Sequence, residues 1–174
     1  MSQLKSISSE IGNKNKTYYP TTGCRILEFE VGSNYQRVEL WDVSGDLKYE
    51  HCWPAVMDGL HCMNETSTCS TNDERNGKRS KVDGVLLVYN LDETSQHTEV
   101  GLWYDHFVLK QKLDKDNACM VLVHSWEGEK SFHHTSAPQL QQCKRTIYSG
   151  HQSQMKVKES FTEWVDLLSC KSES

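Results

Sequence analysis

Two apolar runs place the strongest constraint on how this chain can fold. Residues 84–89 read Gly-Val-Leu-Leu-Val-Tyr and residues 119–123 read Cys-Met-Val-Leu-Val. Short continuous runs of this kind are typical of strands buried on both faces of a sheet. Between them, apolar residues recur at the spacing of one helix face: Val100, Trp103, Tyr104, Phe107 and Val108. A strand, a helix and a strand in this order predict a parallel βαβ unit.

The segments around this unit complete an α/β pattern. β-rich runs at 24–31 and 37–43 are separated by Gly-Ser-Asn, which predicts an antiparallel hairpin. A helix is expected from about Lys48 to Leu60, with Pro54 near its first turn, where proline is tolerated. Residues 144–148 and 157–168 predict a last strand and a closing helix. We therefore expect an α/β domain with a mostly parallel sheet, to which the hairpin adds an antiparallel edge.

Length and composition favour a single domain over residues 1–174. Residues 64–82 are rich in Ser, Thr, Asn and charge, and this composition predicts a disordered insertion. The net charge of −5, from 19 basic and 24 acidic residues, argues against nucleic acid or an anionic membrane as a partner.

The cysteines indicate a reduced, cytoplasmic compartment. There are seven, an odd number without the spacing of a disulfide framework, and no signal peptide opens the chain. Cys170 lies one position too far from the end for prenylation, so no direct membrane anchor is expected.

Polar residues next to two of the predicted strands form the best candidate site. Asp42 and Gly45 end the second hairpin strand as D-x-x-G, which offers a carboxylate for Mg²⁺ and a glycine N–H for a phosphate. Thr21 lies just before the first strand, where its hydroxyl could reach the same metal. D-x-x-G alone is a weak signal, because the same residues also make ordinary turns.

The wider sequence around this motif resembles a known family. Residues 18–23 read Tyr-Tyr-Pro-Thr-Thr-Gly, residues 39–46 read Glu-Leu-Trp-Asp-Val-Ser-Gly-Asp, and residues 52–55 read Cys-Trp-Pro-Ala. These stretches, with 83–90 and 119–124, resemble Rab-type small GTPases. More narrowly, they look like the Rab-like subunit of intraflagellar transport complex B. The resemblance covers most of residues 18–124 and implies a Ras-like P-loop NTPase-type sheet with flanking helices.

The resemblance implies roles for three residues. Thr21 is similar to the switch threonine that contacts Mg²⁺ and the γ-phosphate, Asp42 to the metal aspartate, and Gly45 to the γ-phosphate sensor. The phosphate-binding loop is missing, however, since no G-x-x-x-x-G-K-[ST] occurs in the sequence. Asp46 stands where active GTPases have the water-orienting glutamine, so efficient hydrolysis is not expected and the chain is expected not to act as an enzyme.

Guanine recognition also lacks its usual motif. His-Ser-Trp-Glu at 124–127 occupies the place of N-K-x-D, where Glu127 could accept hydrogen bonds from a base or simply belong to a loop. By the same resemblance, Ser149 is the candidate for a relic of the next GTPase motif along the chain. No cofactor is therefore expected, and GTP or GDP with Mg²⁺ would require a P-loop in a longer form.

The missing loop raises a structural problem. In the Ras-like fold the P-loop strand lies between the strand ending at Asp42 and the strand at 84–89. Its removal should leave two rows of unpaired backbone groups in the interior. We therefore expect a truncated domain lacking its first strand, from a shortened gene product or an incomplete gene model.

By resemblance, the chain is expected to be a non-catalytic subunit that docks on the coiled-coil pair of the transport complex. The expected location is the cilium or flagellum, its basal body and the cytoplasm. The alternative is a GTP-binding switch whose P-loop is missing from this sequence. Tyr18, Tyr19 and Trp53 are interface candidates, because loops beside edge strands often present aromatics to partners.

A metal site is a further alternative. It would draw on His-Cys pairs at 51–52 and 61–62 and on His133-His134. Close Cys-x-x-Cys pairs are absent, so these residues read more simply as ordinary helix and loop positions.

Overall fold

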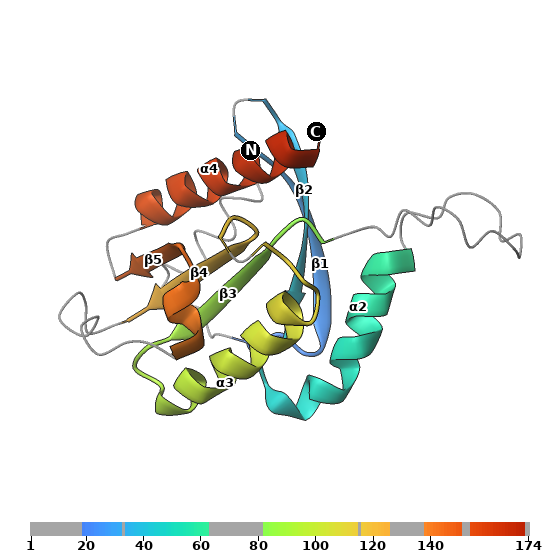
Figure 1. Ribbon diagram of the computed structural model, residues 1–174, viewed down its shortest axis with the longest axis vertical. Helices are drawn as coiled ribbons and strands as arrows, with labels where there is room; N and C mark the ends of the chain where they lie inside the picture. Colours follow the sequence, from blue (N-terminus) through green and yellow to red (C-terminus); the bar gives the residue numbers. More distant parts are fainter. Residues whose placement is uncertain are drawn as a thin grey trace, which may run out of the picture.

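The computed structural model describes residues 19–32, 34–62, 82–114, 116–125, 138–150 and 154–172 (Figure 1). In chain order the elements are β1 (Cys24–Val31), β2 (Gln36–Val43), η1 (Leu47–Cys52), α2 (Trp53–Cys62), β3 (Val85–Asn90), α3 (Thr94–Tyr104), η2 (Asp105–Leu109), β4 (Cys119–His124), η4 (Pro138–Gln142), β5 (Arg145–Ser149) and α4 (Gln154–Ser172).

The parallel βαβ unit predicted from the apolar runs is confirmed. Strands β3, β4 and β5 form a three-stranded parallel sheet in that order, with Val85 opposite Cys119 and Met120 opposite Arg145. β4 lies in the middle, and five of its six residues are buried. This central position explains why its sequence shows no alternation between apolar and polar residues.

In Figure 1 α3 covers one face of the parallel sheet and α4 the other, and each face carries a separate core. The larger core packs α3 and the start of α2 against the sheet, with Trp53, Tyr104, Val108 and Val121 among its most buried members. The smaller one packs α4 through Trp164 onto Met120, Leu122 and Ile147. Trp164 also donates a hydrogen bond from Nε1 to the Asn117 carbonyl at 2.7 Å, which fixes α4 relative to the start of β4.

The predicted hairpin is present, with every residue of β1 paired to β2 from Cys24–Val43 to Val31–Gln36. Among the described residues of its turn, Gly32 (φ 73°) and Tyr35 (φ 54°) are left-handed. Glycine adopts such a φ without steric cost, whereas tyrosine does so only under the constraint of the tight connection.

The prediction that the hairpin forms the edge of one continuous sheet is wrong. Within the described residues β2 pairs only with β1 and β3 only with β4, so the strands form one two-stranded and one three-stranded sheet. The interruption falls where the resemblance predicted a break, between the strand that ends at Asp42 and the strand at 84–89.

Side chains hold the two sheets together where backbone pairing does not. Phe29 of β1 lies 6.3 Å from Phe161 of α4, between ring centroids. Val43 at the end of β2 packs against the larger core. The hairpin is therefore attached to the parallel sheet through the helices on both faces.

The single helix expected at about 48–60 is instead two segments, a 3-10 helix (η1) followed by α2. Pro54 is the second residue of α2 and has no N–H to donate, so an α-helix cannot run through it without losing a hydrogen bond. The Asp46 side chain accepts a hydrogen bond from the Lys48 N–H at 3.0 Å and caps the start of η1.

The predicted helix face on residues 100–108 is confirmed, since Val100, Trp103, Tyr104 and Val108 are buried. The helix does not stay regular, however. Residues Asp105–Leu109 form a π-helical turn (η2), closed by the Lys110 N–H on the Asp105 carbonyl at 3.0 Å. Such turns are rare and occur often at functional sites.

β3 departs from the expectation of a strand buried on both faces. Leu87 and Tyr89 are each 4% exposed, but Val88 between them is 51% exposed. One face of β3 is thus less covered than its sequence indicated.

Several predicted features lie outside the described residues. These are most of the 64–82 insertion, Tyr18, His133, His134 and Glu127. Among the described helices, none is long and apolar enough to cross a bilayer.

Two substitutions on β3 test this burial pattern. Leu87→Ala should lower the free energy of unfolding by about 2–5 kcal/mol, because it leaves a cavity in the larger core. Val88→Ala, one residue away on the exposed face, should cost less than about 1 kcal/mol. Urea unfolding followed by circular dichroism measures both, and equal losses would contradict the described exposure of Val88.

Candidate functional site

Thr21 and Asp42, which the sequence assigned to one site, lie next to each other. The Thr21 Oγ1 hydroxyl donates a hydrogen bond to Asp42 Oδ2 at 2.9 Å. Arg25, which faces Asp42 directly across the hairpin, contacts the same oxygen through Nε at 2.6 Å. The carboxylate is thus already neutralised by a guanidinium, and a divalent cation would have to compete with Arg25 for it.

The third predicted residue, Gly45, is held by packing. The Ser44 N–H donates to the Gly23 carbonyl at 2.8 Å, which ties the D-x-x-G segment to the loop that carries Thr21. A Cβ on Gly45 would lie 2.7 Å from Cζ2 of Trp103. The glycine is therefore required here by the Trp103 indole, whatever else it contacts.

Asp46 serves as a helix cap and an ion-pair partner. Besides capping η1, its carboxylate lies 2.5 Å from Lys48 Nζ. Hydrogen bonds from Lys48 lower the pKa of Asp46, so the carboxylate is charged at neutral pH. This negative charge is at the position that the resemblance gives to the water-orienting glutamine.

The carboxyl ends of β4 and β5 are joined by hydrogen bonds within the chain. His124 Nδ1 lies 3.0 Å from the Ser149 hydroxyl, and the Ser125 hydroxyl donates to Asp92 Oδ1 at 2.7 Å. The Ser125 N–H also donates to the Ser149 carbonyl at 3.1 Å. Ser149, proposed as a motif relic, thus has its hydroxyl engaged by a neighbouring strand.

Of the interface candidates, Tyr19 is 81% exposed and remains available for contact. The assignment of Trp53 to an interface is wrong. Its side chain is 1% exposed, and its ring lies 5.2 Å from those of His106 and Phe107. Trp53 begins a helix that packs on the sheet. In the core its indole buries more apolar area than it could at the surface, and this favours the buried position.

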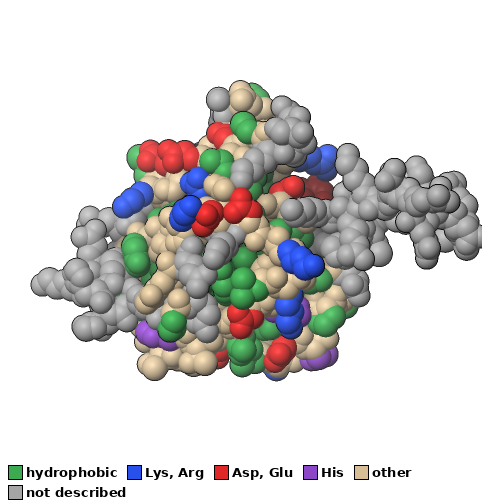
Figure 2. All heavy atoms as spheres, in the orientation of Figure 1, with side chains coloured by type: hydrophobic (Ala, Val, Ile, Leu, Met, Phe, Trp, Pro, Cys, Tyr) green, Lys and Arg blue, Asp and Glu red, His purple; other side chains and the backbone are tan. Residues whose placement is uncertain are grey.

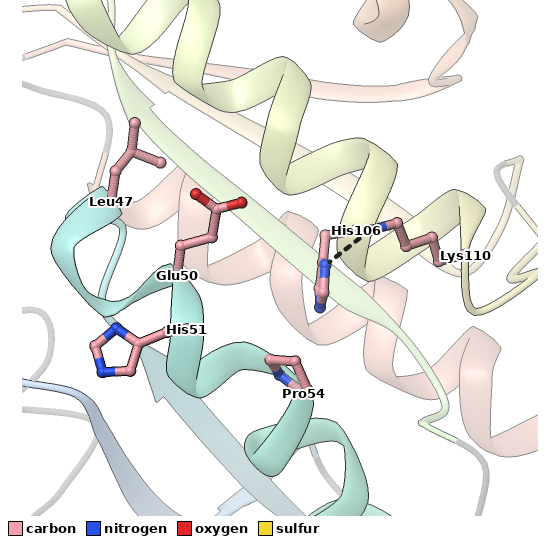
Figure 3. Close-up of a pocket in the computed structure, with 6 residues that line it drawn as sticks. All are labelled: Leu47, Glu50, His51, Pro54, His106 and Lys110. Carbon is pink, nitrogen blue, oxygen red and sulfur yellow. Dashed lines mark hydrogen bonds between the residues drawn. The ribbon is translucent and has the colours of Figure 1, made fainter.

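A surface groove lies over this buried tryptophan, and sequence reasoning did not find it. Figure 3 shows its two walls: η1 and the start of α2 supply one, and the end of the α3–η2 helix supplies the other. The groove has a volume of about 480 Å³ and is lined by Leu47, Glu50, His51, Pro54, His106 and Lys110. We call it the η1–η2 groove. No motif marks it, because its walls are 52 or more residues apart in the sequence.

Two basic side chains of the groove are coupled. Lys110 Nζ lies 3.3 Å from His106 Nδ1. Burial first, and the Lys110 charge second, lower the pKa of His106, whereas Glu50 opposes the shift. With Nδ1 facing the ammonium as an acceptor, the neutral ring carries its proton on Nε2.

No metal centre is formed by the described residues, where no three His, Cys, Asp or Glu side chains converge. Cys119 and Cys143 lie 3.7 Å apart between their sulfur atoms in the larger core. Their mutual hydrogen bond and burial raise the pKa of Cys119, so this thiol is neutral. Burial, with the thiols nearby, raises the pKa of Tyr104 to about 12.

Comparison with known proteins confirms the resemblance inferred from the sequence. No family model matches the chain. It is 38% identical over 118 residues to the intraflagellar transport protein 22 homolog of Macaca fascicularis, covering 64% of this chain and 51% of that protein. The Xenopus tropicalis protein of the same name is 35% identical over 116 residues, covering 64% and 50%. The intraflagellar transport associated protein 2 of Caenorhabditis elegans is 29% identical over 133 residues, covering 67% and 43%. The matching part thus spans about half the length of the curated relatives.

Gly45→Ala tests whether packing fixes this glycine. The added methyl group would strike the buried Trp103 ring, so the free energy of unfolding should fall by about 1–3 kcal/mol without any ligand present. In a Trp103→Leu background the same substitution should cost less, because the clash is removed. Urea unfolding of the four chains measures the coupling, and purely additive losses would count against this packing role.

Proton NMR of His106 tests the coupling in the groove. The midpoint of the His106 pH titration should lie below the ordinary histidine pKa of about 6.5. Lys110→Gln should raise this midpoint, because it removes a positive neighbour. Because the unfolded chain binds this proton more readily, the contribution of His106 to stability is retained above the ordinary pKa and lost as pH falls below it. An unchanged midpoint in Lys110→Gln would contradict the contact.

Proposed function

We propose that this chain acts as a non-catalytic, Rab-like subunit of intraflagellar transport complex B, in cilium or flagellum assembly. The observation that carries this proposal is its 35–38% identity to intraflagellar transport protein 22 homologs over 64% of the chain. The subunit would work through protein contacts, with the coiled-coil members of the complex as its partners. Its place would be the cilium, the basal body and the surrounding cytoplasm.

The site chemistry supports a non-catalytic role. A triphosphate needs a cradle of main-chain N–H groups and a lysine, and the sequence of residues 1–174 contains no motif of this kind. Asp42 is paired with Arg25, and Asp46 places a charged carboxylate at the position where hydrolysis needs a neutral amide. The residues present therefore fit a magnesium nucleotide poorly, and no catalytic step is assigned to them.

The architecture supports a Ras-like origin for the domain. The order hairpin, helix, strand, helix, strand, strand and closing helix, with the short η4 between the last two strands, is compatible with such a fold. The separation of β2 from β3 is compatible with such a sheet without its central strand.

A second function, a GTP-binding switch, is favoured by one observation. Thr21 and Asp42 lie together through their 2.9 Å hydrogen bond, and the 2.8 Å Ser44–Gly23 bond ties the segment that carries Gly45 to the loop that carries Thr21. A longer form of the protein, whose P-loop strand lay between β2 and β3 in the sheet, would supply the missing cradle for the phosphates.

Affinity purification tests the first function. The tagged chain, expressed in ciliated cells, should recover complex B subunits that mass spectrometry identifies by name. A tagged Rab-type GTPase of similar size serves as the control for non-specific recovery. Recovery of no complex B subunit above that control would refute the proposal.

Calorimetry separates the two functions. Titration of GTP and GDP with Mg²⁺ into the purified 174-residue chain should give no binding heat, because no cradle holds the phosphates. Saturable binding by this chain would overturn the non-catalytic assignment and favour the switch.

A further inference from the structure

Two thiols meet inside the larger core and take no part in the candidate site. Cys119 Sγ lies 3.7 Å from Cys143 Sγ. The side chains are well shielded, since Cys119 is 0% exposed and Cys143 is 7% exposed. On the face shown in Figure 2, by contrast, hydrophobic side chains lie interspersed with acidic, basic and histidine side chains. The interior thus brings together two groups of one chemistry, which this mixed surface does not.

The ends of three elements position the pair. Cys119 is the first residue of β4, and Cys143 lies between η4 and β5. The Cys143 N–H donates to the Leu140 carbonyl at 2.9 Å, which holds Cys143 against η4. Closer to solvent, Lys144 Nζ lies 2.7 Å from Asp116 Oδ2. The thiol pair and this ion pair therefore link the same two stretches of chain, one in the core and the other at the surface.

The two sulfur atoms are close enough to form a bond. Their separation of 3.7 Å is that of two reduced thiols in contact. A disulfide requires about 2.05 Å, so the sulfurs have to approach by about 1.7 Å. Small rotations about χ1 of both residues cover this distance.

Burial makes the reduced pair slow to react. The hydrogen bond from Cys143, followed by burial, raises the pKa of Cys119, so the closed fold holds almost no thiolate at this position. Tyr104, which is 2% exposed, lies beside both thiols and shields them further. Disulfide exchange requires a thiolate. Reaction therefore has to wait for a local opening of the core, and Cys143, the more exposed of the two, meets a reagent first.

We propose that Cys119 and Cys143 form a redox-sensitive pair, which a small-molecule disulfide such as oxidised glutathione converts to an internal disulfide. The Cys143 thiolate attacks one sulfur of the oxidant, forms a mixed disulfide and releases one thiol. The Cys119 thiolate then attacks Cys143 Sγ, which forms the internal bond and releases the second thiol. The protein loses two electrons and two protons, and one molecule of the oxidant takes them up as two thiols. This inference does not depend on the proposed function.

The internal bond would stabilise the connection between β4 and β5. It joins residues 24 positions apart, and closing a loop of this length restricts the unfolded chain. At the carboxyl ends of the same strands, the Ser125 N–H already donates to the Ser149 carbonyl at 3.1 Å. The oxidised form would thus have β4 and β5 linked at both ends. Its Tm should exceed that of the reduced form by about 5–10 °C.

Peptide mapping by mass spectrometry tests the pairing. The full chain is incubated with oxidised and reduced glutathione, its remaining thiols are alkylated, and it is digested without reduction. Peptides linked through Cys119 and Cys143 should be the main internal disulfide, and dithiothreitol should return both to free thiols. Cys170, which is exposed on α4, should carry glutathione instead and shows that the oxidant was active. Full modification of Cys170 without the linked peptides, or a different internal pair in their place, would overturn the proposal.

Thermal unfolding of two variants separates this bond from general oxidation. The oxidised and reduced forms of one variant are compared with each other, so that any destabilisation by the substitution itself cancels. Cys143→Ala should lose the rise in Tm on oxidation, because Cys119 then has no partner. Cys170→Ser, the control at an exposed position, should keep it. An equal rise in both variants would show that another reaction stabilises the oxidised chain, and the assignment to Cys119 and Cys143 would be wrong.

Discussion

Side-chain packing through two helices, rather than backbone pairing, joins the hairpin to the rest of this molecule. A Ras-like sheet relies on its central strand to link the strands on either side, and here β2 and β3 each have one unpaired edge among the described residues. The link is made instead by Phe29 against Phe161 on one face and by Val43 and Gly45 against the larger core on the other. The position of the D-x-x-G segment therefore depends on Trp103, and that of the hairpin's far end on α4.

Much of the fold was predictable because the parallel strands are buried. A strand such as β4, covered on both faces, leaves a continuous apolar run in the sequence, and the helix after β3 leaves its 3.6-residue period. The exposure of Val88 was not predictable, because it depends on what covers one face of β3 and not on β3 itself. The break between η1 and α2 could have been read from Pro54, which the sequence analysis placed within a single helix.

Part of the candidate site was also predictable, because it depends on residues next to the predicted hairpin strands. Thr21 and Asp42 lie close in sequence to strands whose pairing brings them together, so a local pattern was sufficient. Arg25 was missed, although its place directly opposite Asp42 follows from the hairpin register. The η1–η2 groove had no local signal, because it requires knowledge of how α3 packs against the start of α2. Trp53 was misassigned for the same reason, since an aromatic residue beside a proline looks similar whether it faces solvent or a core.

The wide turn at η2 also bears on how chains of this kind can be compared. A π turn holds one more residue than an α turn. Here it ends the helix, with α3 before it and a turn at residues 110–112 after it, so the additional residue does not rotate α3. A related chain one residue shorter between Asp105 and Leu109 could therefore keep the same buried positions with an ordinary helix. Alignments should admit a one-residue gap at this point, and the equivalents of Val108 and Lys110 should be located by counting back from β4.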